Sequence, residues 1–360
     1  MRNLIIGNLI ARFPIVQGGM GVGVSLSGLA SSVANQGGIG IISLAGVGLF
    51  EKDSSYNFIE ATKRAIRNEI QKAREKTKGI LGVNILTVVT DYGEIVKTAI
   101  AEKIDIIFAG AGLPLDLPSY VPKDSDVKLV PIVSSARTIE LICQKWSRNY
   151  GRFPDAIVLE GPEAGGHLGF KKEQLSNPNF ALDKIFVDVL KSVTEIESLH
   201  GIKIPIITAG GIYTGADIHR MMKMGASGVQ MGTRFVTTFE CDASDAFKKM
   251  YIEAGPEDID IINSPVGLPG RAIHNNFLQK VQDGKKHPVN CHYHCLKTCD
   301  YTTAPYCILN ALLNAAKGNM ESGFAFCSSS VVNAKEIISV AQTFSDIIAE
   351  YDAVNMLDPI

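Results

Sequence analysis

The chain has 360 residues, of which 46% are hydrophobic and 20% are charged, and its formal net charge is −2. This composition predicts a globular protein with a large core and excludes a disordered or fibrous chain. Because the charge is nearly balanced and no block of Lys and Arg stands out, nucleic acid is excluded as an expected partner.

The N-terminus and the cysteine content bear on location. Residues 1–11 are only briefly apolar before Arg12 and Pro14, too short a run for a signal peptide or a membrane-spanning helix. We therefore expect a cytoplasmic protein with no membrane partner. Seven cysteines are an odd number and cytosolic thiols are normally reduced, so no disulfide framework is expected.

Short apolar runs alternate with helix-like segments over the first 254 residues. The runs predicted to be strands are 13–17, 39–43, 80–85, 105–109, 129–134, 156–159, 205–211 and 228–233. Helices are expected at 26–36, 57–76 and 92–102, and another between the last two strands. Eight strand-helix units in this length predict an α/β fold, the (β/α)8 TIM barrel, whose active site lies at the C-terminal ends of the strands.

A doubly wound sheet is the alternative fold. It would concentrate its glycines in the first crossover, whereas here glycine or polar residues follow nearly every strand, which favours the barrel. Residues 255–360 continue no strand-helix repeat and contain two helical patterns, near 307–317 and 334–349. We therefore divide the chain into a barrel, residues 1–254, and a mainly helical C-terminal lid or packing region, residues 255–360.

Glycine-rich turns follow the seventh and eighth predicted strands. Ala209, Gly210 and Gly211 end the seventh, and Gly232 and Thr233 end the eighth. Barrels use the backbone amides of these two loops to bind phosphate groups. Either turn alone could be a plain tight turn, but their joint position predicts a site for a phosphorylated cofactor.

The first and third strands end in residues suited to the same mouth of the barrel. Gln17, Gly18, Gly19 and Met20 would lie near a ring system of the cofactor, and Asn84 would reach in as a polar anchor. The alternative is structural: the glycines would serve a turn with positive φ, and the asparagine would cap its own loop.

The sixth strand runs into a loop, residues 160–169, that contains His167. Ala164, Gly165 and Gly166 have almost no side chain, so a flat ligand could lie against their backbone while the histidine projects over it. A histidine in this place is a candidate general acid or base. A structural histidine bonded to the backbone is the alternative.

Four ordered motifs resemble the nitronate monooxygenase family, formerly called 2-nitropropane dioxygenases, which also includes the flavin-dependent type II enoyl-ACP reductases. The motifs are PIVQGGMG at 14–21, EGPEAGGHLG at 160–169, AGGI at 209–212 and QMGTRF at 230–235. The resemblance covers about residues 10 to 245 of the chain.

The resemblance implies a barrel that binds FMN. It places the phosphate at the two late glycine turns and the flavin ring at the first strand's glycines, and it assigns Glu160 to ribityl hydroxyls. The residues expected at the cofactor are Gln17, Gly18, Gly19, Met20, Asn84, Glu160, Ala164, Gly165, Gly166, Ala209, Gly210, Gly211, Gln230, Gly232 and Thr233. His167 falls on the family histidine, which lies beside the flavin and handles the substrate proton, so it is the expected catalytic residue.

Two reactions fit such a pocket. The first interpretation is a nitronate monooxygenase, which oxidises alkyl nitronates with O2. The alternative is an enoyl-ACP reductase that uses NAD(P)H and meets an acyl carrier protein. A third class, a barrel that binds a phosphorylated ligand without redox turnover, would lack a flavin. A small-molecule substrate is expected for the enzymes, and a homodimer is an option for any of them.

Two further features lie outside the shared motifs. Arg271 ends an apolar loop and could meet a phosphate or carboxylate of a ligand, or could cap the protein's own chain. Thiols at Cys291, Cys295, Cys299 and Cys307 are spaced x3, x3 and x7. They could bind zinc or an iron-sulfur cluster, pack as reduced side chains, or sense redox state.

Overall fold

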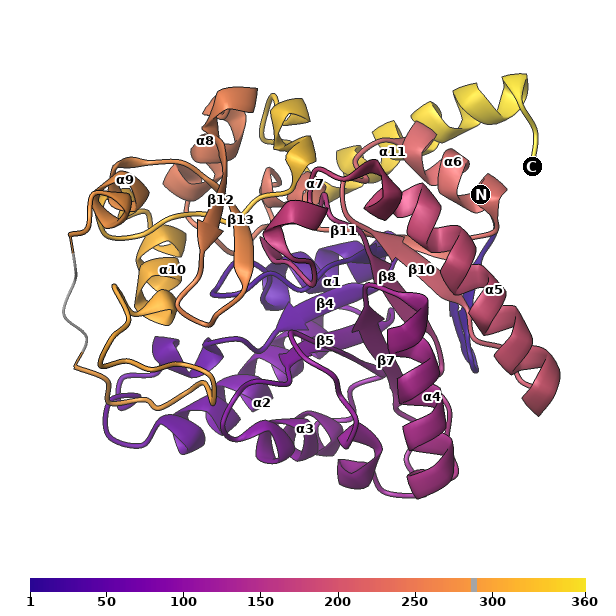
Figure 1. Cartoon of the computed structure of the whole chain (residues 1–360), viewed down its shortest axis with the longest axis horizontal. Coiled ribbons are helices and arrows are strands. Elements are labelled where there is room, and N and C mark those ends of the chain that lie inside the picture. Colours follow the sequence, from indigo (N-terminus) through magenta and orange to yellow (C-terminus); the bar gives the residue numbers. More distant parts are fainter. Residues whose placement is uncertain (286–289) are drawn as a thin grey trace.

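Eight parallel strands form a barrel at the centre of the chain (Figure 1). The computed structural model describes residues 1–285 and 290–360. The barrel strands are β3 (Ile15–Gln17), β4 (Gly40–Ser43), β5 (Leu81–Leu86), β6 (Ile106–Gly110), β7 (Lys128–Val133), β8 (Ile157–Glu160), β10 (Ile206–Ala209) and β11 (Gly228–Met231). Their order is β3-β11-β10-β8-β7-β6-β5-β4. Hydrogen bonds join Ile39 to Ile15 and Gln17 and close the ring, so the predicted barrel is confirmed.

Helices follow the strands and cover the outside of the barrel. The helices up to the seventh strand-helix unit are α1 (Ser27–Asn35), α2 (Phe58–Lys76), α3 (Tyr92–Ala101), α4 (Ala136–Tyr150), α5 (Leu182–His200) and α6 (Gly215–Met224). The later helices are α7 (Thr233–Val236), α8 (Asp245–Glu253), α9 (Asn276–Gln282), α10 (Ile308–Ala316) and α11 (Val340–Leu357). Short 3-10 turns are η1 (Val47–Phe50), η2 (Leu117–Tyr120), η3 (Lys172–Gln174), η4 (Pro178–Phe180), η5 (Pro256–Asp258), η6 (Met320–Ser322) and η7 (Ser329–Asn333).

Local sequence signals set the helix ends. Ser135 accepts a hydrogen bond from the Thr138 amide at the start of α4, and Gly151 ends that helix in the left-handed region with φ 62°. At the start of α6, Thr214 and Asp217 form a reciprocal capping box. These ends place the loops that precede α4 and α6 at the same mouth of the barrel.

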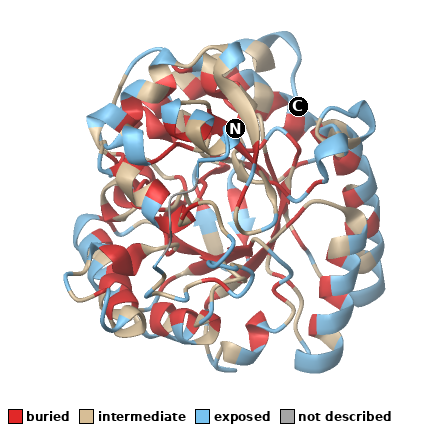
Figure 2. Ribbon diagram, turned by 60° about the vertical axis from the view of Figure 1, so that its left-hand side comes forward, coloured by how far each residue is buried: buried red, intermediate tan, exposed pale blue. Residues whose placement is uncertain are grey.

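The core has two layers. Inside the barrel, apolar side chains such as Phe108 and Val158 fill the centre. Between barrel and helices, a larger layer includes Trp146 of α4, whose ring nitrogen donates to the Pro114 carbonyl at 2.9 Å. Figure 2 shows this arrangement as buried residues inside and exposed residues on the outer helix faces.

A short hairpin that the sequence did not predict precedes the barrel. Its strands are β1 (Leu4–Ile6) and β2 (Leu9–Ala11). Leu4, Ile6 and Ala11 are buried among the side chains that fill the barrel. The hairpin therefore plugs the end of the barrel opposite the mouth, and strands of three residues are too short to show a clear period in the sequence.

The C-terminal region contains a second hairpin as well as helices. Its strands are β12 (Ile259–Asn263) and β13 (Pro269–Ile273), and β13 also pairs with β9 (Gly166–His167). The last helix, α11, returns to the barrel and packs between α6 and α1, where the eighth helix of a barrel belongs (Figure 1). The division of the chain at residue 254 stays a prediction.

Candidate active site

A cavity of about 270 Å3 opens at the C-terminal ends of the barrel strands. The predicted residues on its wall are Gly18, Gly19, Met20, Asn84, Glu160, Ala164, Gly165, Gly166, His167, Gly210, Gly211, Gln230, Gly232 and Thr233. Gln17 and Ala209 lie behind this wall. The Gln17 side chain instead bonds the Gly18 carbonyl and the Ile41 amide, which fixes the loop that carries the first glycines.

The loops after β10 and β11 form the end of the cavity expected to hold phosphate. Gly210 and Gly211 both have positive φ, 96° and 77°, which turns successive backbone amides in one direction. Among the described residues, the amides of Gly211 and Ile212 meet no hydrogen-bond acceptor. The Thr233 hydroxyl accepts the Ser328 amide at 3.0 Å. This end of the cavity therefore offers free donors to an anion.

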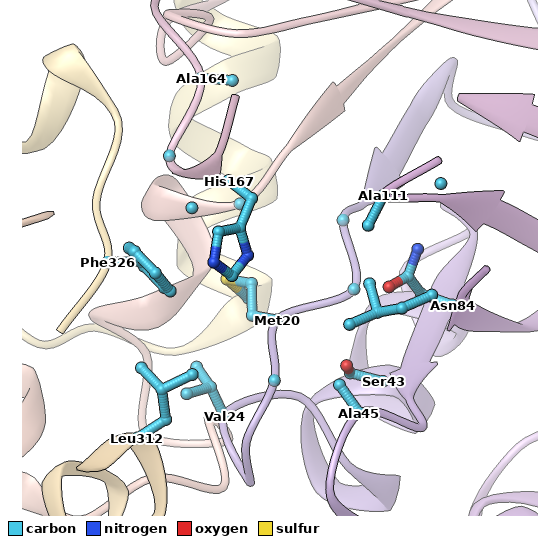
Figure 3. A pocket seen from close by; sticks show the side chains of 18 of the residues that line it. Met20, Val24, Ser43, Ala45, Asn84, Ala111, Ala164, His167, Leu312 and Phe326 are labelled. Carbon is cyan, nitrogen blue, oxygen red and sulfur yellow. The ribbon is translucent and has the colours of Figure 1, made fainter. Parts of the chain in front are cut away.

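The opposite wall brings the first and third strands into close contact. A Cβ at Gly19 would lie 2.2 Å from the Cβ of Asn84, so only glycine fits there. The Ser43 hydroxyl is buried at the cavity wall and has no hydrogen-bond partner in the described part of the chain. Figure 3 shows Ser43, Asn84 and Ala111 on one side of the cavity, facing His167 and Phe326. A buried polar atom without a partner indicates a place for a ligand.

Glu160 ends β8 and faces the cavity. Its carboxylate makes no hydrogen bond with any residue in the described ranges, and burial raises its pKa to about 7. A carboxyl group with such a pKa is partly protonated at neutral pH, so it can both accept and donate hydrogen bonds to a hydroxylated ligand.

The histidine loop is held in place by the C-terminal hairpin. His167 pairs with Gly270 of β13. Arg271 is buried and donates two hydrogen bonds, to the carbonyls of Pro162 at 2.7 Å and of Ala164 at 2.6 Å. Of the two roles considered for Arg271, the structure therefore shows the capping of the protein's own chain.

One ring nitrogen of His167 has a hydrogen-bond partner among the described residues, and the other has none. Its Nε2 lies 2.7 Å from the Ser264 hydroxyl, and its ring packs edge-on against Phe326 at 5.0 Å. The Val266 amide also donates to the serine oxygen at 3.4 Å; we assign the serine proton to the bond with Nε2, which leaves the ring proton on Nδ1. Burial lowers the pKa of His167 to about 4, so the ring is neutral at pH 7.

Removing the Ser264 hydroxyl is expected to slow turnover without loss of the cofactor. Ser264→Ala leaves Nε2 unpaired, which we expect to lower kcat about tenfold. The hydroxyl stabilises the neutral ring, so its loss should also move the acidic limb of the pH-rate profile to higher pH. Ser264→Thr should restore both; a profile identical to wild type in Ser264→Ala would show that Ser264 only packs there.

Glu160 and His167, both half-buried, are expected to contribute to the unfolding free energy with opposite pH dependences. The pKa of Glu160 is raised, so its contribution is present below about pH 4.5 and is lost as the pH rises through about 7. The pKa of His167 is lowered, so its contribution is present above about pH 6.5 and is lost as the pH falls through about 4.

Glu160→Gln separates these two contributions. From pH 5 to pH 8, cofactor-free wild type should lose about 2 kcal/mol of unfolding free energy that the variant keeps. Urea unfolding at both pH values measures the difference. Parallel pH dependence in the two proteins would contradict the raised pKa of this carboxyl group.

A second, wider cavity of about 980 Å3 joins the first. The residues common to both are Ala111, Ile132, Glu160, His167 and Leu268. Arg137 and Lys171 lie on its wall, and neither forms an ion pair within the described part of the chain. His167 therefore stands between a glycine-lined cavity and an open space with unpaired positive charge.

Several residues of the cavity wall could not be assigned from the sequence. They come from segments far from the four motifs: Ser43, Ala45, Tyr251, Leu296, Leu309, Leu312, Phe326 and Ser328. Ser264, which bonds the histidine, lies in the apolar loop before Arg271. Its position as a polar residue within an apolar loop was the available signal, but the sequence does not show that it contacts His167.

The four cysteines of the predicted cluster lie on a loop beside the cavity, and all are half-buried free thiols. Within residues 1–285 and 290–360, no three His, Cys, Asp or Glu side chains converge closely enough to hold a metal ion. In the same part of the chain, no helix is both long and apolar enough to cross a membrane.

The fold and the cavity define the class of protein: a (β/α)8 barrel with glycine turns after its last two strands and a half-buried histidine at its mouth. The sequence profile of nitronate monooxygenases matches residues 2–350. The chain therefore belongs to the nitronate monooxygenase family.

Relatives and solved structures agree with this assignment. A probable nitronate monooxygenase of Staphylococcus saprophyticus is 26% identical, with 78% of this chain and 80% of the relative covered. The structure of FabK from Thermotoga maritima superposes with a TM-score of 0.74 at 28% identity, covering 96% of this chain and 94% of that one.

A differently named activity also occurs among the relatives. The (3aS,4S,5R,7aS)-5-hydroxy-7a-methyl-1-oxo-octahydro-1H-indene-4-carboxyl-CoA dehydrogenase of Mycobacterium tuberculosis is 27% identical over 76% of this chain. The match spans 66% of that dehydrogenase, just under two thirds of its length.

Proposed function

We propose that the protein is an FMN-dependent oxidoreductase of the nitronate monooxygenase type, which oxidises alkyl nitronates with O2. The observation that carries the proposal is the position of His167, a half-buried neutral histidine over a cavity whose far end offers backbone amides to a phosphate group. Family membership and the Staphylococcus saprophyticus relative support the same reaction.

The residues of the cavity fit FMN. The Gly211 and Ile212 amides suit its phosphate, because they meet no acceptor among the described residues. The turn at Gly232 lines the same end of the cavity. The Glu160 carboxyl and the Ser43 hydroxyl, which have no hydrogen-bond partner among residues 1–285 and 290–360, suit the hydroxyls and polar ring atoms of the same molecule. When bound, FMN supplies the electron transfer, which no side chain of the cavity can supply.

The protein's own residues bind and orient the substrate. With its proton on Nδ1, His167 can donate a hydrogen bond to an oxygen of the nitronate, and Ser264 keeps the ring in that tautomer. Phe326 packs against the ring and, with Leu312 and Val24, makes the wall around it apolar (Figure 3). This wall excludes water from the reacting group.

A second candidate reaction is the NAD(P)H-dependent reduction of an enoyl thioester. The observation that favours it is the wider cavity, where Arg137 and Lys171 could bind the phosphate of a nicotinamide dinucleotide or of a pantetheine arm. The similarity to FabK and to the carboxyl-CoA dehydrogenase supports this second candidate. An acyl carrier protein would then be a partner.

Anaerobic flavin reduction distinguishes the candidates. Purified protein is mixed with propyl-2-nitronate, NADH or NADPH, and the flavin absorbance near ~450 nm is followed. Bleaching by the nitronate alone supports the monooxygenase, and bleaching by a nicotinamide supports the reductase. A purified protein without any flavin band would contradict both and favour the non-redox ligand-binding barrel. The homodimer, the cytoplasmic location and a zinc ion or an iron-sulfur cluster at the cysteines stay predictions.

A further inference from the structure

Arg271 is a buried cation without an acidic partner. Its side chain is 7% exposed, and within the described part of the chain it hydrogen-bonds only backbone carbonyls and forms no ion pair. Residues 286–289 contain no Asp or Glu. By contrast Lys248, which is similarly buried, pairs with Asp245 at 3.6 Å. A buried charge without a counter-charge is costly, so Arg271 indicates a negative charge that the chain itself does not supply.

The guanidinium lies directly behind the wall of the cofactor cavity. One of its hydrogen bonds goes to the Ala164 carbonyl at 2.6 Å. The N–H of a trans peptide points opposite to its C=O, so the Gly165 amide, which belongs to the same peptide group, points away from the guanidinium. Among the described residues this amide meets no acceptor, and Gly165 lies on the cavity wall. One peptide group therefore separates the buried charge from a donor available to a ligand.

Contacts of the loop place this donor at the phosphate end of the cavity. A Cβ at Gly210 would lie 3.1 Å from the Ala164 amide nitrogen, so the loop packs against the turn after β10. A Cβ at Gly165 would lie 2.8 Å from the Ser328 amide nitrogen, and that amide donates to the Thr233 hydroxyl at 3.0 Å. Gly165 thus lies between the turns that follow β10 and β11.

We propose that Arg271 is the counter-charge of the ligand's phosphate and acts on it through the Ala164–Gly165 peptide. The inference rests on the proposed binding of FMN. In the loaded protein, the Gly165 amide donates to the phosphate beside the Gly211 and Ile212 amides. The guanidinium polarises the peptide that it binds, and its positive charge lowers the free energy of an anion in the cavity. Arg271 is a positioning residue, because it touches the loop and not the ligand.

The acidic residue nearest to this end of the cavity is Glu163. Its carboxylate lies against the backbone of Gly211 and accepts the Ser329 hydroxyl at 3.0 Å. The side chain is exposed, so water screens it, and it forms no ion pair with Arg271 in the described part of the chain. Beside Gly211, the carboxylate disfavours an anion. A phosphate at this place therefore needs a positive charge in addition to backbone donors.

The test compares FMN with riboflavin, which lacks only the phosphate. Cofactor-free protein is titrated with each flavin, and the two dissociation constants are measured by fluorescence. Arg271→Gln keeps an amide donor for the carbonyls but loses the charge. It should weaken the binding of FMN about tenfold and change that of riboflavin less than about twofold.

Two further variants isolate the charge. Arg271→Lys keeps it and should retain most of the wild-type preference for FMN over riboflavin. Lys248→Gln removes a buried cation that has its own acid, so it should retain the preference as well. An unchanged preference in Arg271→Gln would overturn the proposal. An equal loss in the glutamine and lysine variants would overturn it too, because Arg271 would then act only as a donor to the loop.

Inorganic phosphate tests the charge without a flavin. Compared with chloride at equal ionic strength, phosphate well above its Kd should raise the Tm of cofactor-free wild type by about 2 °C. Arg271→Gln should lose this rise and Arg271→Lys should keep it. If the glutamine variant does not fold, the other two proteins still decide: the absence of a phosphate-specific rise in both would overturn the proposal. Wild type that responds to phosphate but binds neither flavin would contradict the proposed FMN and leave the role of Arg271 standing.

Discussion

Replacing His167 by alanine should lower the turnover of propyl-2-nitronate by roughly 10²–10⁴-fold while FMN stays bound. The side chain lies between the two cavities, and its neutral ring, with the proton on Nδ1, can donate a hydrogen bond to an oxygen of a small substrate at pH 7. The backbone of the loop is fixed independently, by Arg271 and by pairing with β13, so the truncation should leave the loop in place.

His167→Gln is the matched control for this variant. Glutamine can keep a hydrogen bond to Ser264 but cannot exchange a proton, so it should be as slow as alanine if proton handling is what matters. Steady-state kinetics with flavin content measured on the same samples decides the outcome. Wild-type turnover in His167→Ala would remove this residue from the mechanism.

The change expected to act most strongly on the cofactor is Gly232→Asp, which should abolish FMN retention. A Cβ at Gly232 would make only ordinary contact with Met20, at 3.4 Å, and the residue has φ −103°, so the protein can accept a side chain there. The carboxylate would face the phosphate. Like charges about 4 Å apart repel by about 4 kcal/mol at an effective dielectric constant of 20, nearly a thousandfold in Kd.

Gly232→Ala separates the charge from the added bulk. It places the same Cβ against Met20 without a charge and should keep most of the flavin. Fluorescence titration of the cofactor-free proteins with FMN gives both dissociation constants. Equal and normal affinity in the aspartate variant would place the phosphate elsewhere in the cavity.

The sequence predicted the barrel well because its strands are buried on both faces and therefore read as continuous apolar runs. The predicted strand at 80–85, for example, became Leu81–Leu86. The hairpin β12–β13 was not predicted, because Arg271 and Gly270 interrupt its period and its pairing with β9 joins positions about a hundred residues apart.

The site could be predicted where glycine or polar residues mark the ends of the strands. Gly210 and Gly211 marked a turn after the seventh strand, and both have positive φ in the structure. Gly18 and Gly19, for which a turn with positive φ was the alternative, do not have it. Gln17 was expected at the ligand and instead lies behind the wall, since sequence shows that a residue is near a mouth but not which way its side chain turns. Ser43 and Phe326 reach the cavity only through tertiary packing, for which the local pattern has no signal.

The chain leaves the barrel after α7 and returns to it before α11, and the two crossing segments lie next to each other. Thr238 and Ile338 form a parallel bridge, and the Phe239 amide donates to the Ile338 carbonyl at 2.9 Å. Residues 239–338, which carry the β12–β13 hairpin and the cysteine loop, are thus an insertion whose two stems stand side by side. An insertion of this kind can be lengthened, shortened or exchanged in evolution without disturbing the eight strands beneath it. Reaction specificity can therefore change in the insertion while the barrel that we propose to bind the phosphate stays the same.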